Sequence, residues 1–165
     1  MPSVTRIAVI DDHPLYRAGL RQALGAAPDL EIVAEGCDAG DALQIAQTNE
    51  QDIILLDINI PGGGIEAGHK ISCSQPDTKL VFLTNSESDA NVLTVMEMGA
   101  HGYIIKGVSG AELIEVLRLI HGGQYYVTPN LAADVLRKIC RSNPPNSSSR
   151  RDVQPGTSLG GSQLF

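Results

Sequence analysis

Residues 53–59 read Ile-Ile-Leu-Leu-Asp-Ile-Asn, four consecutive apolar residues that end at the carboxylate of Asp57. A short apolar run without polar alternation is typical of a strand covered on both faces, as in a parallel sheet flanked by helices. Four similar runs occur elsewhere in the chain, at residues 7–10, 30–33, 80–83 and 102–105. The sequence therefore predicts five strands.

Segments with apolar residues at helical spacing lie between these runs. They fall around residues 20–27, 39–46, 92–96 and 113–120, with a weaker one around 65–73. Residues that commonly cap or begin a helix precede four of them: Asp12 or His13 with Pro14, then Asp38, Ser88 and Ser109. The alternation predicts an α/β fold, a doubly wound (βα)₅ flavodoxin-like sandwich with a five-stranded parallel sheet.

The length of 165 residues is enough for one domain with an extension. We expect the domain to occupy residues 1–123. Apolar residues at helical spacing between residues 127 and 141 predict a linker helix over 124–141. Residues 142–165 are rich in Ser, Pro and Gly and poor in apolar residues, so we expect a disordered tail.

The charge is distributed unevenly: residues 1–123 carry 17 acidic and 7 basic residues, whereas residues 124–165 carry 2 and 5. An acidic domain repels phosphate backbones, so DNA binding by the domain itself is not expected. The start of the chain lacks a signal peptide pattern and no long apolar stretch follows, which predicts a cytoplasmic protein without a membrane span. The three cysteines lack metal-ligand spacing and are expected to be buried or incidental thiols.

Polar residues follow four of the five predicted strands. They are Asp11 and Asp12 after the first, Asp57 and Asn59 after the third, Thr84 after the fourth and Lys106 after the fifth. Binding sites in parallel sheets form at the carboxyl ends of strands, so these side chains are expected to meet. Three crowded carboxylates repel one another unless a cation joins them, and their oxygen donors suit Mg²⁺.

The same group of side chains fits phosphoryl transfer. Asp57 ends the central apolar strand and precedes a loop with Pro and Gly, which leaves it accessible as a nucleophile. A metal ion, Lys106 and Thr84 would neutralise and orient the phosphoryl oxygens.

This set of residues resembles the receiver domain of two-component response regulators, over roughly the first 123 residues. Three stretches are further similar to the NarL/FixJ (LuxR-type) subfamily: Val-Ile-Asp-Asp-His-Pro-Leu-Tyr-Arg-Ala-Gly-Leu at 9–20, Gly-Ala-His-Gly-Tyr-Ile-Ile-Lys at 99–106 and Tyr-Val-Thr-Pro at 126–129. The loop at 61–66 is about one residue shorter than the pattern usual in the family, and Gly107 and Asn85 replace its commoner residues.

The resemblance implies that a sensor histidine kinase phosphorylates Asp57. It implies Mg²⁺ (or Mn²⁺) held by Asp12, Asp57 and the backbone carbonyl of Asn59, with Asp11 acting through water. Lys106 would pair with the phosphoryl group, and Thr84 and Tyr103 would act as switch residues. The chain would then be a phosphoacceptor switch that assists only its own phosphorylation and dephosphorylation, rather than an enzyme with a separate substrate.

Taken singly, these residues also have ordinary interpretations. An Asp pair before Pro14 can be a turn with a helix cap, and an isolated lysine is usually a solvated surface charge. Tyr103 is as readily a core ring with its hydroxyl at the surface as a switch. The four histidines share no metal-ligand spacing, so capping, surface or packing roles are expected for them.

Three functions remain open at this point. The first is a transcription regulator whose C-terminal helix-turn-helix domain is absent from this chain, through which alone it would contact DNA. The second is a stand-alone receiver that acts as a protein-interaction switch or phosphorelay module. The third is an Asp-based phosphohydrolase, which is weakened because Asn59 stands where an Asp-x-Asp pair needs its second carboxylate. Homodimer formation is left open in each case.

Overall fold

A computed structural model describes residues 3–86 and 91–142. The chain divides into two compact units, residues 1–132 and 133–165, and each is described by itself. The expected cap Ser88 and nearly all of the expected tail lie outside the described residues.

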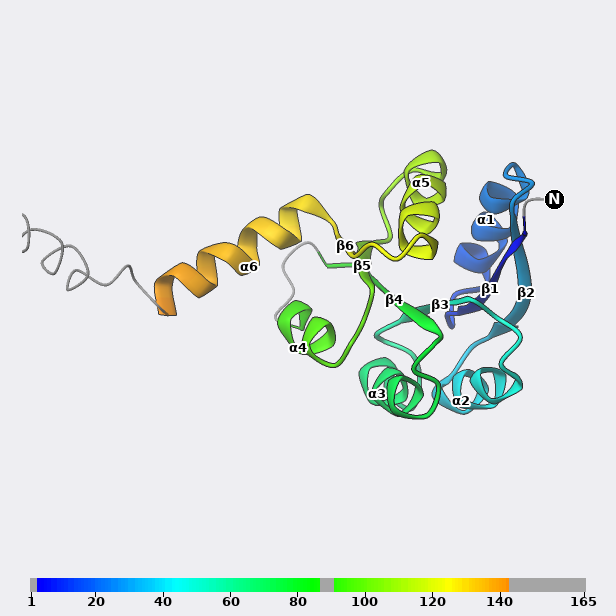
Figure 1. Cartoon of the computed structure of the whole chain (residues 1–165), viewed down its shortest axis with the longest axis horizontal. Coiled ribbons are helices and arrows are strands. Elements are labelled where there is room, and N and C mark those ends of the chain that lie inside the picture. Colours follow the sequence, from blue (N-terminus) through cyan, green and yellow to red (C-terminus); the bar gives the residue numbers. More distant parts are fainter. Residues whose placement is uncertain (1–2, 87–90, 143–165) are drawn as a thin grey trace, which may run out of the picture. The chain divides into compact units, whose positions relative to one another are not determined.

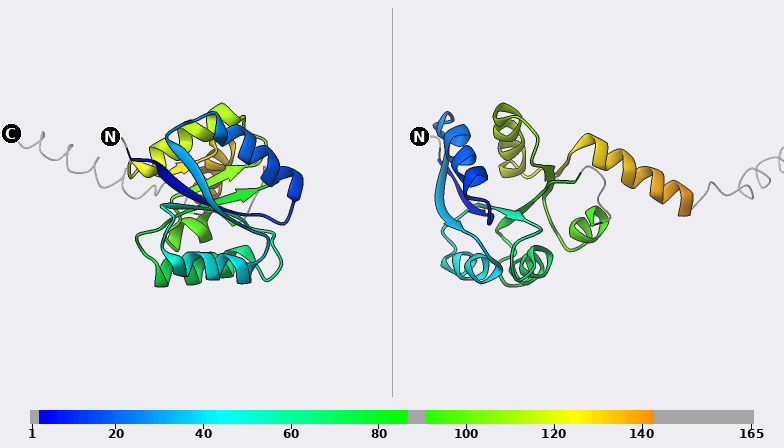
Figure 2. Two further views of the ribbon diagram at one scale, coloured as in Figure 1. Left: turned by 90° about the vertical axis from the view of Figure 1, so that its right-hand side faces the viewer. Right: turned by 180° about the vertical axis from the view of Figure 1, so that it is seen from behind.

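Strands and helices alternate along the first unit, as the sequence predicts. The elements are β1 (Thr5–Ile10), α1 (Pro14–Gly25), β2 (Leu30–Gly36), α2 (Ala39–Thr48), β3 (Ile53–Asp57), α3 (Gly64–Ser74), β4 (Lys79–Thr84), α4 (Val92–Glu97), β5 (Gly102–Ile105), α5 (Gly110–His121), β6 (Tyr126–Val127) and the start of α6 (Pro129–Ser142). The sheet has the order β2-β1-β3-β4-β5-β6, and every pair of neighbours is parallel. Helices α1 and α5 cover one face, and α2, α3 and α4 cover the other (Figures 1 and 2).

The prediction of five strands was one short, because β6 adds a sixth. This strand has two residues and pairs with β5, Gly102 opposite Tyr126 and Tyr103 opposite Val127. A two-residue strand is too short to produce a periodic pattern, so periodicity could not reveal it. The weakest predicted helix, around 65–73, is present as α3.

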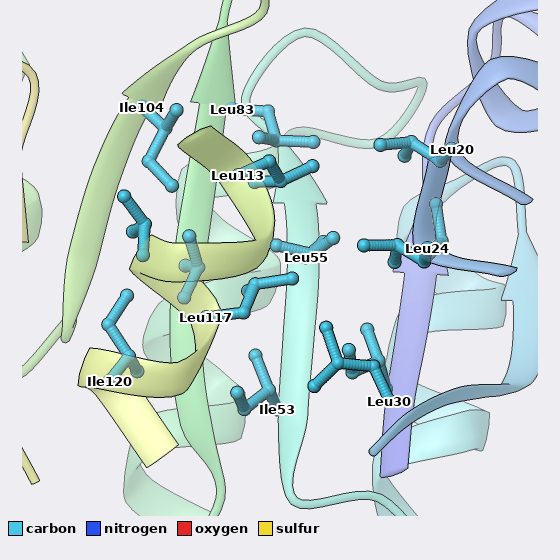
Figure 3. Packing of buried hydrophobic residues seen from close by; sticks show 14 of the residues in the cluster. Leu20, Leu24, Leu30, Ile53, Leu55, Leu83, Ile104, Leu113, Leu117 and Ile120 are labelled. Carbon is cyan, nitrogen blue, oxygen red and sulfur yellow. The ribbon is translucent and has the colours of Figure 1, made fainter. Parts of the chain in front are cut away.

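The core confirms that the central strand is covered on both faces. All five residues of β3 are buried. Figure 3 shows Leu55 of β3 facing Leu113 and Leu117 of α5 and Leu24 of α1, all of which are buried in one apolar cluster. Burial of this kind stabilises a domain mainly through the hydrophobic effect, and it holds the carboxyl end of β3 in a fixed position.

Helix starts largely follow the predicted caps. The side chain of Asp38 accepts a hydrogen bond from the backbone of Asp41 at 2.7 Å, and that of Ser109 accepts one from the backbone of Glu112 at 3.1 Å. At α1, His13 occupies the cap position and Pro14 follows it, but the His13 side chain makes no capping hydrogen bond. The imidazole is therefore available for other contacts.

Three further predictions concern the cysteines, membrane-spanning helices and the linker helix. The cysteines Cys37, Cys73 and Cys140 are all free and exposed, so of the two expected alternatives they are incidental rather than buried thiols. Within the described ranges, no helix has the length and apolar character needed to cross a membrane. The predicted linker helix is present as α6, with bounds of 129 and 142 in place of 124 and 141.

Candidate functional site

The sheet brings the predicted site residues to one edge. Asp11 follows β1, Asp57 ends β3, Thr84 ends β4 and Lys106 follows β5. Because β1 and β3 are neighbours, with Ile10 opposite Leu56, the carboxylates of Asp11 and Asp57 lie side by side. Both aspartates are completely buried, at 0% exposure, so the expectation that the loop after β3 leaves Asp57 accessible was wrong.

Lys106 joins these two carboxylates. Its Nζ lies 2.5 Å from Asp11 Oδ2 and 3.1 Å from Asp57 Oδ2, and its side chain is only 8% exposed. A single ammonium thus faces two buried carboxylates, and the site retains an excess of negative charge. Buried charges are stable only when they are paired, so this excess favours the binding of a further cation.

The loop after β3 fixes the orientation of Asp57. Its Oδ1 accepts a hydrogen bond from the backbone of Asn59 at 3.0 Å, which leaves Oδ2 facing Lys106. The start of α3 packs closely beneath this loop: a Cβ on Gly64 would lie 2.3 Å from the backbone oxygen of Asp57. Glycine at position 64 is therefore required for the close approach that holds the aspartate in place.

Thr84 and Tyr103 occupy the neighbouring strands. Thr84 is buried, and its Oγ1 accepts a hydrogen bond from the backbone of Ser86 at 3.1 Å. Tyr103 is completely buried on β5, opposite Phe82 of β4. The interpretation of Tyr103 as a core ring with its hydroxyl at the surface does not fit this complete burial. The switch role of Tyr103 remains a prediction.

One residue of the site was missed by the sequence analysis. His13 Nδ1 lies 2.9 Å from Asp11 Oδ1, 3.1 Å from Asp12 Oδ1 and 3.9 Å from Asp57 Oδ2. The only signal was its position directly after the Asp pair, because no ligand spacing linked it to another residue. The expected capping, surface or packing role therefore did not include these contacts with the acidic site.

A second missed residue is Tyr16 on α1. The Nζ of Lys106 lies 4.6 Å from the centroid of its ring, which is a cation–π contact. The pKa of Tyr16 is raised to about 12, first by burial and then by the negative charges of Asp11 and Asp57. The Tyr16 ring therefore packs against the ammonium of Lys106.

The Tyr16 hydroxyl should titrate well above an ordinary tyrosine, whose pKa is about 10. The folded state holds this proton more tightly than the unfolded chain, so the associated stability is fully present below pH of about 10. It is lost as the pH rises towards the folded pKa of about 12. The ultraviolet absorbance of tyrosinate, measured as the difference between wild type and Tyr16→Phe, gives the value. A midpoint near 10 in that difference would contradict the burial and charge described for Tyr16.

The site offers a compact set of donors to a metal ion. One atom each from Asp11, Asp12, His13 and Asp57 lies within 4.8 Å of all the others. Three of the four are carboxylate oxygens, which are the donors that Mg²⁺ prefers. The chemistry of these residues fits a hard divalent cation, and the part assigned to the Asn59 carbonyl remains a prediction.

Comparison with known proteins gives a consistent result. The family model of the response regulator receiver domain matches residues 7–118. The response regulator GacA of Pseudomonas aeruginosa is 34% identical over 154 residues, which cover 90% of this chain and 72% of that protein. The response regulator UvrY of Escherichia coli is 35% identical over 153 residues, covering 90% and 70%.

A solved structure shows the same likeness in three dimensions. It is a two-component response regulator of the LuxR family from Aurantimonas sp. SI85-9A1, at 33% identity and a TM-score of 0.77, covering 82% of this chain and 98% of that one. The doubly wound fold, the acidic site at the sheet edge and the sequence match agree. This chain belongs to the response regulator receiver domain family of two-component signalling systems.

Proposed function

We propose that Asp57 is the phosphoacceptor and that a sensor histidine kinase is the donor. The observation that carries this proposal is the buried Asp57 carboxylate, which ends the central strand with Lys106 on one side and Asp11 beside it. The third hypothesis, a phosphohydrolase with a separate substrate, lacks support because Asn59 cannot replace a second acidic group.

In the transfer, an oxygen of Asp57 attacks the phosphorus of a phosphohistidine. The P–N bond breaks as the new P–O bond forms, and the imidazole leaves with its electron pair and takes a proton from solvent. Lys106 neutralises charge on the phosphoryl oxygens, because its ammonium already lies 3.1 Å from Asp57 Oδ2. Asp12, Asp57 and the Asn59 carbonyl, with Asp11 acting through water, would hold Mg²⁺ or Mn²⁺, which when bound offsets the charge of the phosphoryl group.

The negative charge that phosphorylation adds at Asp57 would shift the equilibrium between two conformations of the domain. A phosphoryl group on Asp57 introduces acceptor oxygens beside the end of β4, where Thr84 can donate its hydroxyl proton to them. A shift of Thr84 changes the space next to β5 and hence the packing of Tyr103, which is buried there. The surface formed by α4, β5 and α5 would carry the signal outward.

The output proposed for the intact protein is control of transcription through a C-terminal helix-turn-helix domain absent from this chain. The similarity to the transcriptional regulatory protein DegU of Brevibacillus brevis, 32% identical over 137 residues, supports the control of transcription. Residues 1–128, which include β6, would act as the cytoplasmic receiver, α6 as the linker helix and the residues after it as the tail. DNA contact and any homodimer face would belong to the intact protein.

The proposal predicts one labile, Mg²⁺-dependent phosphate per chain. Incubation with a small phosphodonor such as acetyl phosphate, followed by intact mass measurement, should show the mass of a single phosphoryl group. The same reaction in EDTA should show none, because three carboxylates then face the anionic donor with only Lys106 to offset them. Equal incorporation with and without Mg²⁺, or several phosphates per chain, would contradict the proposal.

A further inference from the structure

His13 contributes an imidazole nitrogen to the acidic site, in addition to the ammonium of Lys106. Its Nδ1 faces carboxylate oxygens of three residues, Asp11, Asp12 and Asp57, at 2.9, 3.1 and 3.9 Å. The His13 side chain is 55% exposed, whereas Asp11 and Asp57 are buried. An ion can therefore reach the cluster from solvent on the side where His13 stands.

The separation of 2.9 Å is that of a hydrogen bond, and the three separations together bracket the one needed around a metal ion. Ligand atoms bound about 2.1 Å from a tetrahedral ion lie about 3.4 Å from one another. The three distances from His13 Nδ1 fall on both sides of that value. Lys106 contacts Asp11 through Oδ2, so Oδ1 of Asp11 can face the ion together with the imidazole. The four ligand atoms lie within 4.8 Å of one another, and an ion bound between them would replace the hydrogen bond between His13 Nδ1 and Asp11 Oδ1.

The nitrogen changes which ion the cluster prefers. Carboxylate oxygens alone suit Mg²⁺, which keeps several waters and an octahedral shell. An imidazole added to carboxylates suits Zn²⁺, which binds more tightly than the earlier divalent metals at such sites and accepts four ligands. A four-ligand zinc shell that includes an oxygen of Asp57 has no open position for a phosphoryl oxygen. The zinc ion would also bind the Asp57 carboxylate that has to attack the phosphorus.

We propose that His13, Asp11, Asp12 and Asp57 form a Zn²⁺ site that competes with Mg²⁺ and blocks phosphorylation of Asp57. The inhibitory consequence rests on the proposed function of Asp57, whereas the zinc site itself does not. Nδ1 of His13 would bind Zn²⁺ through its lone pair, in place of its hydrogen bond with Asp11 Oδ1. No redox step is involved.

A second group of possible zinc ligands among the described residues serves as a control for the zinc site at His13. Cys37, Asp38 and Asp41 also offer ligand atoms within 4.8 Å of one another. The Cys37 thiol donates to Asp41 Oδ2 at 3.4 Å, and this hydrogen bond is the main cause that raises the pKa of Cys37. A thiol that holds its proton is a poorer zinc ligand, so the site at His13 should bind first.

The test measures Zn²⁺ binding to the full chain by calorimetry. The variant His13→Asn keeps a hydrogen-bond donor and removes the ring nitrogen, and it should lower Zn²⁺ affinity by about tenfold or more. Affinity for Mg²⁺ should change much less, because Mg²⁺ uses the carboxylate oxygens. His69→Asn, an exposed histidine on α3, and Cys37→Ser should both retain the tight zinc site.

Nitrogen NMR of the imidazole rings identifies the ligand atom directly. One equivalent of Zn²⁺ should move the Nδ1 resonance of His13 and leave that of His69 in place. Unchanged His13 resonances, or tight binding that survives His13→Asn and disappears in Cys37→Ser, would overturn the zinc site. If the wild type still takes up phosphate with Mg²⁺, only this inference fails. If zinc binds at His13 but Mg²⁺ supports no phosphorylation, the proposed function fails instead.

Discussion

The variant Asp57→Asn should incorporate no phosphate and should still fold. The amide nitrogen and oxygen of asparagine lack the negative charge that attacks phosphorus, so the acceptor is removed. Asparagine Oδ1 can still accept from the Asn59 backbone, and Asp11 keeps its contact with Lys106. Because one of two buried carboxylates that share a single ammonium is gone, the free energy of unfolding should not fall below that of wild type.

Intact mass and urea denaturation, measured on the same preparation, check both parts of this result. The matched control is Asp77→Asn, an exposed aspartate before β4 and away from the site, which should be phosphorylated like wild type. Labelling of Asp57→Asn at the wild-type level would show that the acceptor is another residue. A large loss of stability would show that Asp57 serves the fold more than the chemistry.

The variant Lys106→Met should lose both stability and phosphate incorporation. Methionine has a similar length but no charge, so Asp11 and Asp57 would be left as two buried carboxylates without a cation. Removal of one partner from a buried ion pair typically costs about 3–5 kcal/mol. Urea denaturation should show a loss of that order, and uptake of phosphate should fall steeply because the phosphoryl oxygens lose their fixed positive charge.

The control for this variant is Lys70→Met on α3, where the lysine is exposed and a change within about 0.5 kcal/mol is expected. The double variant Lys106→Met with Asp57→Asn distinguishes the loss of the Lys106 charge from the loss of its packing contacts. Once Asp57 is neutral, the loss of Lys106 leaves one buried carboxylate in place of two and should cost less. Additive effects of the two substitutions would mean that Lys106 and Asp57 do not interact in the folded protein.

Most of the fold could be predicted from sequence because the burial pattern is simple. The run at 53–56 is apolar on both faces, and β3 is buried throughout. Asp38 and Ser109 cap their helices as their positions predict. The short strand β6 could not be predicted, since its pairing with β5 depends on the tertiary fold. Tyr126 N donates to His101 O and Thr128 N, just after the strand, donates to Tyr103 O, both at 3.0 Å.

The candidate site was predictable where chemistry follows strand ends. Asp11, Asp57, Thr84 and Lys106 could be placed at one edge because parallel strands all point the same way. The positions of His13 and Tyr16 follow from the direction in which α1 leaves β1, and neighbouring residues in a sequence carry no information about that direction. A histidine beside an Asp pair is informative only once the turn is known to bring its Nδ1 to within 2.9 Å of Asp11.

The central claim is that the phosphoryl group is attached to Asp57. A chemical reaction can identify the residue that carries it. Borohydride reduction of the phosphorylated wild-type chain converts an aspartyl phosphate to homoserine, and peptide mass spectrometry then gives its position. We expect homoserine at residue 57 in the peptide that spans β3, with Asp11 and Asp12 unchanged. Homoserine at residue 11 or 12, or a phosphate that resists reduction and stays on another side chain, would contradict the account.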